Sequence, residues 1–372
     1  MSTTSRNYSI DLLRIVSMIG VVFLHVLGHG GVLNLVLSPL NYSMVWFLEV
    51  LAFPAVNCFV LISGYVGYKS ERVFPKIKNL LTLLFTVSFY SILLFFIFYF
   101  CGPEEVGLKD MIRSFFPMIF KNYWFFTIYF GLMLLSPMLN LFVYKSNFKH
   151  TFAFFTVFLF FIIISTVYDS FSFIDGYTVI WFVFMYLVGA MINKYNLNRL
   201  LSRKIWFLIF VAMFVITWLS KIILNFLNIS FLASHSSILV NYVSPTIVLM
   251  AIALLMFFSR IECKPSFASI ISFFSSSAFS VYLIHDNTYV RNYVISRIHT
   301  YIDDSNFLLF ILFIVSIVVA IFLICILIDK VRIIIFKTIK VDKMSEKIGE
   351  IIEKLINIIY MKFEKKVQKT EV

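Results

Sequence analysis

Long apolar runs separated by short polar segments dominate the chain from one end to the other. Each run approaches the roughly 20 residues that an α-helix needs to cross the hydrocarbon layer of a membrane. The runs lack the short alternating pattern of barrel strands. Because a bilayer admits only helices and closed barrels, the pattern predicts an all-α, polytopic transmembrane helix bundle. We place ten spans, at residues 10–30, 44–67, 79–101, 122–144, 151–167, 177–193, 205–227, 239–259, 267–287 and 306–329.

Composition excludes several other classes of protein. Of the 372 residues, 61% are apolar and only 13% are charged, whereas a soluble domain carries about 25% charged residues. A soluble fold of this length could not hide so much apolar surface from water. The four cysteines are scattered without the spacing of a metal site or a disulfide scaffold, so we expect no metal ion.

The distribution of charge predicts which way the chain crosses the membrane. There are 31 Lys and Arg residues against 19 Asp and Glu, a net charge of +12. If the N-terminus is cytoplasmic, 24 of the 31 cations fall in loops and a tail on that side, five fall on the other side, and Arg14 and Lys221 lie within spans. This bias predicts a multi-pass protein of the plasma membrane with both termini cytoplasmic. The cations are too dispersed to indicate nucleic acid as a partner.

The chain divides into a transmembrane domain, residues 1–336, and a basic cytoplasmic tail, residues 337–372. In the tail, apolar side chains recur at a spacing of three to four residues between lysines and glutamates, at Met344, Ile348, Ile351, Leu355 and Ile359. This spacing predicts an amphipathic helix that lies on the inner leaflet. A helix that binds a protein partner is the less favoured alternative. A short interfacial helix is expected at 108–120.

Two ionisable residues occupy one face of the first span. Arg14 and His25 are eleven residues apart, which on an α-helix is three turns plus about 20° and a rise of about 16 Å. Arg14 is thus expected near the inner surface and His25 in the outer half, and Asp11 is placed to pair with Arg14. Ionisable residues inside a membrane are candidates for function. The alternatives are a snorkelling Arg14 and a His25 that hydrogen-bonds a neighbouring helix.

The segment from Asp11 to His25 resembles the first span of the integral-membrane acyltransferase family, type three, whose members O-acylate cell-surface glycans. In that family an arginine and a histidine form the signature pair, which maps onto Arg14 and His25. A cytoplasmic R-x-x-R after the second span maps onto Lys69 and Arg72, with lysine in place of the first arginine. Further similar segments are Trp124-Phe125-Phe126 and Val281-Tyr282-Leu283-Ile284-His285.

The resemblance implies a membrane acyltransferase that uses acyl-CoA, by default acetyl-CoA, as a co-substrate and needs no permanently bound cofactor. The acceptor would be a hydroxyl group of a cell-surface glycan or of its lipid-linked precursor. His25 would be the general base, with Arg14 as the second catalytic residue. Positive charge on Lys69, Arg72 and Arg14 would bind the phosphorylated head of the donor from the cytoplasm.

Further polar residues are expected near the outer ends of the spans. Glu49, Trp124 and His285 are candidates for the acceptor side, where Glu49 would orient His25 or bind sugar, and Lys221 and Asp286 would complete a polar chamber. Each has a simpler interpretation, such as an interfacial carboxylate, an aromatic belt residue or a packing histidine. A transporter or flippase of a lipid-linked glycan is the alternative function. Such a protein would show paired broken helices or a repeat of its halves, and the sequence indicates neither.

Overall fold

The computed structural model describes residues 6–69, 72–102, 106–227, 229 and 235–370, and every regular element in these ranges is a helix. The predicted all-α fold is confirmed. Eight helical segments are long and apolar enough to cross a membrane, and two more apolar helices are shorter. The eight are α1 (Tyr8–Leu27), α2 with α3 (Pro39–Ala52 and Ala55–Gly67), α4 (Ile77–Cys101), α6 (Trp124–Lys145), α7 (Phe148–Val167), α9 (Arg203–Phe226), α12 with α13 (Ala268–Ser275 and Ala278–His285) and α15 (Phe307–Thr338).

The two shorter apolar helices are α8 (Val179–Lys194) and α11 (Pro245–Phe258). With these two, each of the ten apolar runs in the sequence corresponds to a helical segment, although the number of segments that cross the bilayer remains a prediction. The other α-helices in the described ranges are α5 (Leu108–Phe115), α14 (Thr288–Tyr293) and α16 (Val341–Thr370). Short 3₁₀ turns lie at Val32–Asn34, Ile174–Gly176, Leu197–Arg199, Pro265–Phe267 and Ile295–Tyr301.

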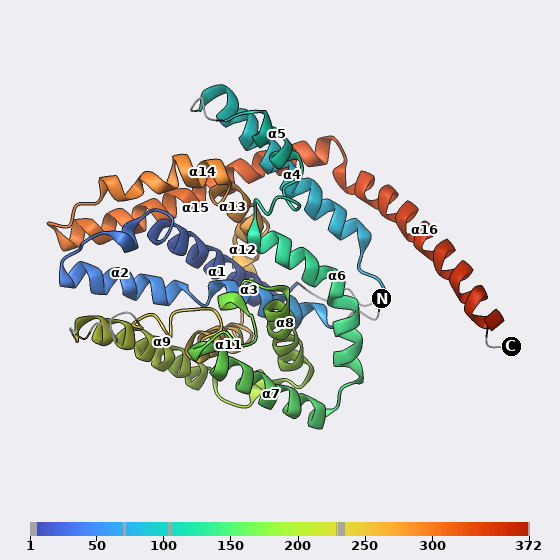
Figure 1. Ribbon diagram of the computed structural model, residues 1–372, viewed down its shortest axis with the longest axis horizontal. Helices are drawn as coiled ribbons and strands as arrows, with labels where there is room; N and C mark the ends of the chain where they lie inside the picture. Colours follow the sequence, from blue (N-terminus) through green and yellow to red (C-terminus); the bar gives the residue numbers. More distant parts are fainter. Residues whose placement is uncertain (1–5, 70–71, 103–105, 228, 230–234, 371–372) are drawn as a thin grey trace.

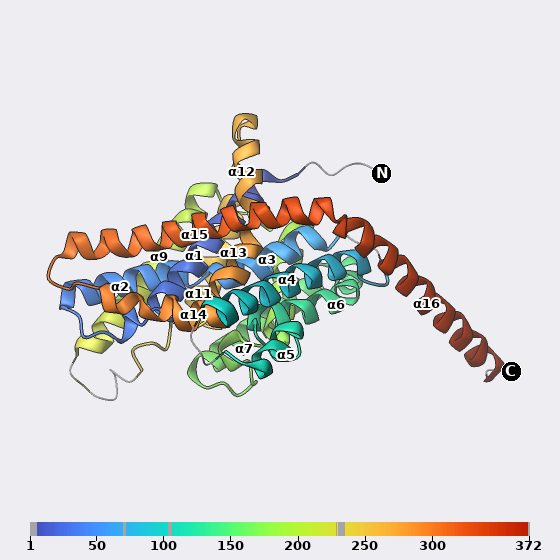
Figure 2. The same ribbon diagram turned by 90° about the horizontal axis from the view of Figure 1, so that it is seen from above.

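Two of the spans are interrupted, which the sequence analysis did not predict. A turn at residues 53–54 separates α2 from α3, where Pro54 has no N–H to donate to the preceding turn. A second turn, at residues 276–277, separates α12 from α13. Figure 2 shows α12 projecting from the bundle, roughly perpendicular to the long α15. Interruptions of this kind free backbone groups and change the direction of the chain within a membrane protein.

The helices run back and forth between two ends of the bundle (Figure 1). We call the end that carries Arg14, Arg72 and Lys76 the basic end. The opposite end, which carries His29 and Asp286, is the distal end. The charge distribution predicts that the basic end faces the cytoplasm. Since α1 runs from the basic end to the distal end, one helix connects the two.

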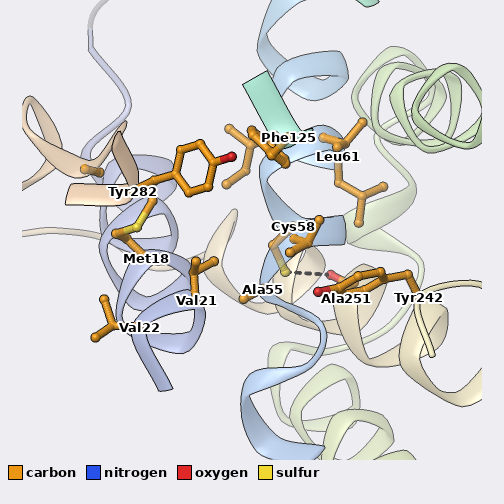
Figure 3. Close-up of a cluster of buried hydrophobic side chains, with 14 of the residues drawn as sticks. Met18, Val21, Val22, Ala55, Cys58, Leu61, Phe125, Tyr242, Ala251 and Tyr282 are labelled. Atoms are coloured by element: carbon orange, nitrogen blue, oxygen red, sulfur yellow. Dashed lines mark hydrogen bonds between the residues drawn. The ribbon is translucent and has the colours of Figure 1, made fainter. Parts of the chain in front are cut away.

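The largest core cluster lies where α1, α3, α11 and α13 meet (Figure 3). Met18 of α1 and Tyr282 of α13 lie together there, and Cys58 of α3 points to Ala251 of α11. Lipid is as apolar as these side chains, so the cluster is held by close packing more than by transfer out of water. It fixes α1 against α13, the two helices that carry His25 and His285.

The tail forms the predicted helix, as α16. The helix leaves the basic end of the bundle obliquely (Figures 1 and 2). Its first turns pack against the start of α4, where Lys78 Nζ lies 3.2 Å from a carboxylate oxygen of Glu346. Met344, Ile351, Leu355 and Ile359 are exposed, and Ile348 is half-buried. Attachment of this face to the inner leaflet remains a prediction.

Two glycines bring α3 and α8 into backbone contact. A Cβ on Gly64 would lie 1.9 Å from the carbonyl oxygen of Tyr186, and a Cβ on Gly189 would lie 2.1 Å from the carbonyl oxygen of Leu61. Both obstacles are backbone atoms, so no side chain can move to make room. Small residues that allow such an approach are typical of membrane helix pairs. Because α3 also packs against α1, the contact with α8 helps to hold α3 in place.

We therefore expect Gly64→Ala to destabilise the protein by about 1–3 kcal/mol, the usual cost of overpacking. The measurement is the midpoint of thermal unfolding in detergent, compared with that of the wild type. Gly107→Ala is the matched control, since a Cβ there meets nothing within 4 Å. Equal midpoints for the Gly64 variant and the wild type would contradict the close contact of α3 and α8.

Candidate active site

Helix α1 presents Arg14 and His25 to two separate cavities. It is a continuous helix whose first turn is capped by the Asn7 side chain, which accepts a hydrogen bond from Ile10 N–H. Arg14 lines the larger cavity, at the basic end, and His25 lines a smaller one toward the distal end. Arg14 and His25 thus lie on one continuous helix, as predicted.

The predicted ion pair between Asp11 and Arg14 is present. Asp11 is almost completely buried, and its two carboxylate oxygens separately accept hydrogen bonds from Arg14 and Arg6 at 2.5 Å. Two cations on one buried carboxylate fix the direction of both arginine side chains. The arrangement holds Arg14, which is 34% exposed, at the cavity instead of letting it extend freely to the surface.

The larger cavity has a volume of about 650 Å³. Arg14, Arg72 and Lys76 supply cations to its lining, and further inside it is lined by polar groups of Ser63, Tyr129 and Asn140. Lys69, expected beside Arg72, is exposed and absent from this lining, and its ammonium lies 5.8 Å from the centre of the Tyr68 ring. Lys76 takes the place expected for Lys69.

The smaller cavity, about 30 Å³ in volume, adjoins the larger one. The two share the side chains of Phe59, Phe125 and Phe279 in their linings. These rings therefore lie between the cation-lined cavity and the cavity of His25. The smaller cavity is also lined by Trp124 and Tyr282, so its walls are largely aromatic.

His25 is held by a chain of hydrogen bonds that fixes the position of its proton. His285 Nδ1 lies 2.6 Å from the carbonyl oxygen of Val281, and His285 Nε2 lies 2.9 Å from His25 Nδ1. A carbonyl only accepts, so His285 carries its proton on Nδ1, and its Nε2 accepts. His25 must then donate from Nδ1. This assignment leaves a free lone pair on His25 Nε2, the atom that a general base needs.

Asp286 and His29 surround the histidine pair at the distal end. Asp286 Oδ1 lies 3.6 Å from His25 Nδ1, 3.9 Å from His29 Nε2 and 3.4 Å from an Arg291 nitrogen. Burial raises the pKa of Asp286, an effect that the neighbouring His285 and Arg291 oppose. Burial also lowers the pKa of His29. Both shifts have the sign that desolvation gives to a charged form.

Aromatic side chains cover the distal side of the smaller cavity. The Trp124 and Tyr177 rings lie 4.5 Å apart, and Tyr177 in turn contacts Tyr242, at 5.5 Å between centres. Tyr177 is 44% exposed, so the cluster reaches the surface. Glu49 is buried, and it interacts electrostatically with Tyr177 and Tyr242. Trp124 and Glu49 are therefore both neighbours of Tyr177, and their place on the acceptor side stays a prediction.

Two expectations need correction. His285 was expected on the acceptor side, but it is 2% exposed and lies behind His25 as its hydrogen-bond partner. His25 thus hydrogen-bonds His285, and no such bond from Glu49 to His25 is seen in the described chain. Lys221 was expected in the same polar chamber. It instead donates to Ser236 and Ser237 and packs over the Trp46 ring, because α9 lies apart from α1.

Lys76 and Tyr282 are site residues that the sequence analysis did not select. Lys76 is one of four cations in its loop, so charge alone does not distinguish it. Tyr282 lies within the segment Val281–His285 that carries the resemblance, and its buried hydroxyl is without a hydrogen-bond partner among the described residues. The sequence therefore already contained Tyr282 in a segment of interest, but only the fold shows that it lines the same cavity as His25.

The family model described as an acyltransferase domain, that of the type-three acyltransferases, matches residues 7–330. No curated protein and no solved structure matches the chain. The match extends from the start of α1 through most of α15 and so includes Arg14, His25, both cavities and the histidine pair. The chain therefore belongs to the acyltransferase family, type three, and is a membrane acyltransferase.

Proposed function

We propose that the protein transfers an acyl group from cytoplasmic acyl-CoA to a hydroxyl group of a cell-surface or exported polysaccharide at the plasma membrane, with His25 as general base. The observation that carries the proposal is the position of His25. It lies between a cavity with cations at its lining and an aromatic cluster that reaches the opposite end of the bundle. Donor and acceptor could therefore approach the same nitrogen from opposite sides.

The larger cavity suits an acyl-CoA donor. Such a molecule joins a phosphorylated head to a long, narrow and mostly uncharged arm. Arg72 and Lys76 are exposed at the basic end and offer charge-assisted hydrogen bonds to phosphate. Arg14 lies in the same lining and would contact the donor as the second catalytic residue. The helical rise of about 16 Å from Arg14 to His25 gives the arm a path from the cations to the base.

The smaller cavity favours a short acyl group. Its volume of about 30 Å³ is small, so the acyl group that reaches His25 must itself be small. An acetyl group is the smallest common acyl group, and a longer chain would have to displace the packed rings of Phe59, Phe125 and Phe279. We therefore propose acetyl-CoA as the donor, bound as a co-substrate and released as free CoA.

His25 supplies the proton transfers that this reaction requires. The acceptor hydroxyl gives its proton to His25 Nε2, and its oxygen forms a bond to the thioester carbon. When the tetrahedral intermediate collapses, the carbon–sulfur bond breaks and the CoA sulfur receives the proton from His25. The products are the ester and CoA thiol, so atoms and charge balance. His285 acts through His25 as a positioning residue, because it keeps the second proton on Nδ1.

Tyr282 is placed to stabilise the oxyanion of that intermediate. Its hydroxyl is buried and makes no direct hydrogen bond among the described residues, it lines the His25 cavity, and in Figure 3 it points toward Phe125 in the first turn of α6. Its polar neighbours are the Asp286 carboxylate and the backbone of Phe125 and Phe126. The first N–H groups of a helix have no partners within the helix. A hydroxyl and a helix N-terminus at one point are typical donors for a developing negative charge.

The acceptor would bind at the distal end. Trp124 and Tyr177 present aromatic faces there, and aromatic rings supply the apolar contact area that sugar rings need. Glu49 is buried beside the same cluster, and one of its carboxylate oxygens has no partner in the described part of the chain, so it can accept a hydrogen bond from a sugar hydroxyl. We propose that these three residues bind the glycan or its lipid-linked precursor.

A transporter of a lipid-linked glycan was the alternative. The interrupted spans α2–α3 and α12–α13 are a feature that transporters share. Membership of an acyltransferase family favours catalysis instead, and a proton acceptor held in one tautomer serves no purpose in moving a glycan. We propose that the interruptions serve to place Glu49 and His285 beside the reaction.

We expect His25→Ala to lower the rate of acyl transfer by about 10²–10⁴-fold, the usual contribution of a general base. His285→Ala should lower the rate less, and the double variant should be no slower than His25→Ala, because His285 acts only through His25. Acetyl transfer by purified protein in detergent is the measurement.

His285→Gln serves as the matched control for this pair, since its side-chain oxygen can still accept from His25 Nδ1. It should recover part of the rate that His285→Ala loses. If the rate loss of the double variant equals the product of the two single losses, His285 does not act through His25. Near-full transfer by a stable His25→Ala protein would remove His25 as the base.

For the donor, we expect Arg72→Ala combined with Lys76→Ala to raise the KM for acetyl-CoA by about tenfold or more, because two charge-assisted hydrogen bonds are lost. The KM for the acceptor should stay within about twofold. Lys69→Ala is the matched control from the same loop, and it should change the donor KM little. A larger effect from Lys69→Ala than from the double variant would contradict the position of the donor head.

For the oxyanion, we expect Tyr282→Phe to lower kcat by about 10²-fold or more, the usual cost of losing one such donor, with little change in either KM. The substitution keeps the ring that packs in the core. Unchanged thermal unfolding with reduced kcat would support the assignment. An unchanged kcat would show that the hydroxyl does not contact the reacting carbonyl.

A further inference from the structure

Three side chains at the distal end converge in a way that the acyl-transfer chemistry does not require. His25, His29 and Asp286 each present one atom able to bind a metal ion, and these atoms lie within 4.8 Å of one another. Asp286 Oδ1 lies 3.6 Å from His25 Nδ1 and 3.9 Å from His29 Nε2. In a tetrahedral zinc site with bonds near 2.0–2.1 Å, neighbouring ligand atoms are about 3.3 Å apart. Small side-chain movements would therefore close the set around an ion.

Asp286 gives a second, independent reason to look for a ligand at this point. Its side chain is 1% exposed, and Oδ2 makes no direct hydrogen bond among the described residues, with the Tyr282 hydroxyl as a polar neighbour of this carboxylate. A buried carboxylate oxygen left without a partner is costly, and a metal ion is one group that would satisfy it. Arg291, 3.4 Å from Oδ1, opposes a further cation, so we expect binding to be reversible.

We propose that His25, His29 and Asp286 form an inhibitory site for a divalent transition-metal ion, with Zn²⁺ as the probe. Two imidazoles and one carboxylate are a ligand set that zinc accepts, with water in the fourth position. Magnesium and calcium prefer sets made of oxygen atoms. His29 is 43% exposed, so an ion from the distal side can reach the site.

Inhibition follows from the chemistry of one imidazole. If the ion binds His25 Nε2, it occupies the lone pair that takes the acceptor proton. If it binds Nδ1, the remaining proton of the neutral ring must move to Nε2, which then becomes a donor. His25 ceases to be a base in both cases. This consequence rests on the proposed function, whereas binding of the ion does not.

The test uses purified full-length protein without a histidine tag. Isothermal titration with zinc chloride should show one site per chain, and His29→Ala should weaken it by about tenfold or more, since one of three protein ligands is lost. His150→Ala removes a histidine at the basic end and is the matched control, with wild-type binding expected. Absence of the site in the wild type, or equal affinity in His29→Ala, would overturn the proposal.

The activity measurement is release of free thiol from acetyl-CoA in the presence of acceptor. Zinc should inhibit the wild type and EDTA should reverse the inhibition, while His29→Ala should stay active at a zinc concentration that stops the wild type. Activation by zinc, or loss of activity in EDTA, would overturn inhibition as the role of the site. If no preparation releases thiol, the proposed function fails, and the titration alone decides whether the metal site exists.

Discussion

The hydrogen bond between His25 and His285 is the interaction on which the rest of the site depends. Two imidazoles, one on α1 and one on α13, meet at 2.9 Å, and the carbonyl of Val281 fixes the proton of the second. These hydrogen bonds need no charged group, and burying a charge inside the bundle would be costly. The hydrogen bond requires α1 and α13 to keep a fixed position relative to each other. The core around Met18 and Tyr282 supplies that constraint (Figure 3).

Interrupted helices make such a polar centre possible within an apolar bundle. The turn before α13 changes the direction of the chain, so that its last residues, His285 and Asp286, reach the end of α1. The turn between α2 and α3 has a comparable effect on Glu49, four residues before it. Elsewhere, close backbone contact at Gly64 and Gly189 ties α3 to α8. Rigid packing in one region therefore supports the interrupted helices in another.

The sequence predicted the helices and the line of chemistry along α1, because both follow from local periodicity. An apolar run of about 20 residues indicates its helix without knowledge of neighbours, and the spacing of Arg14 and His25 fixes their shared face. Charge in loops was less informative. Lys69 and Lys76 belong to one basic segment, and only the path of the chain after α3 shows which of them lines the cavity.

Contacts between distant segments could not be predicted in the same way. His285 lies 260 residues from His25, and an isolated histidine near the end of a span is compatible with many roles. Both ring nitrogens of His285 already make hydrogen bonds, so neither is free to bind the acceptor. The Tyr282 hydroxyl differs in making no direct hydrogen bond among the described residues, and that difference is visible only when its neighbours are known. In this protein the type of a polar residue says little about its role. A polar group whose hydrogen bonds are already made supports the site, whereas one that still lacks them can contact a substrate.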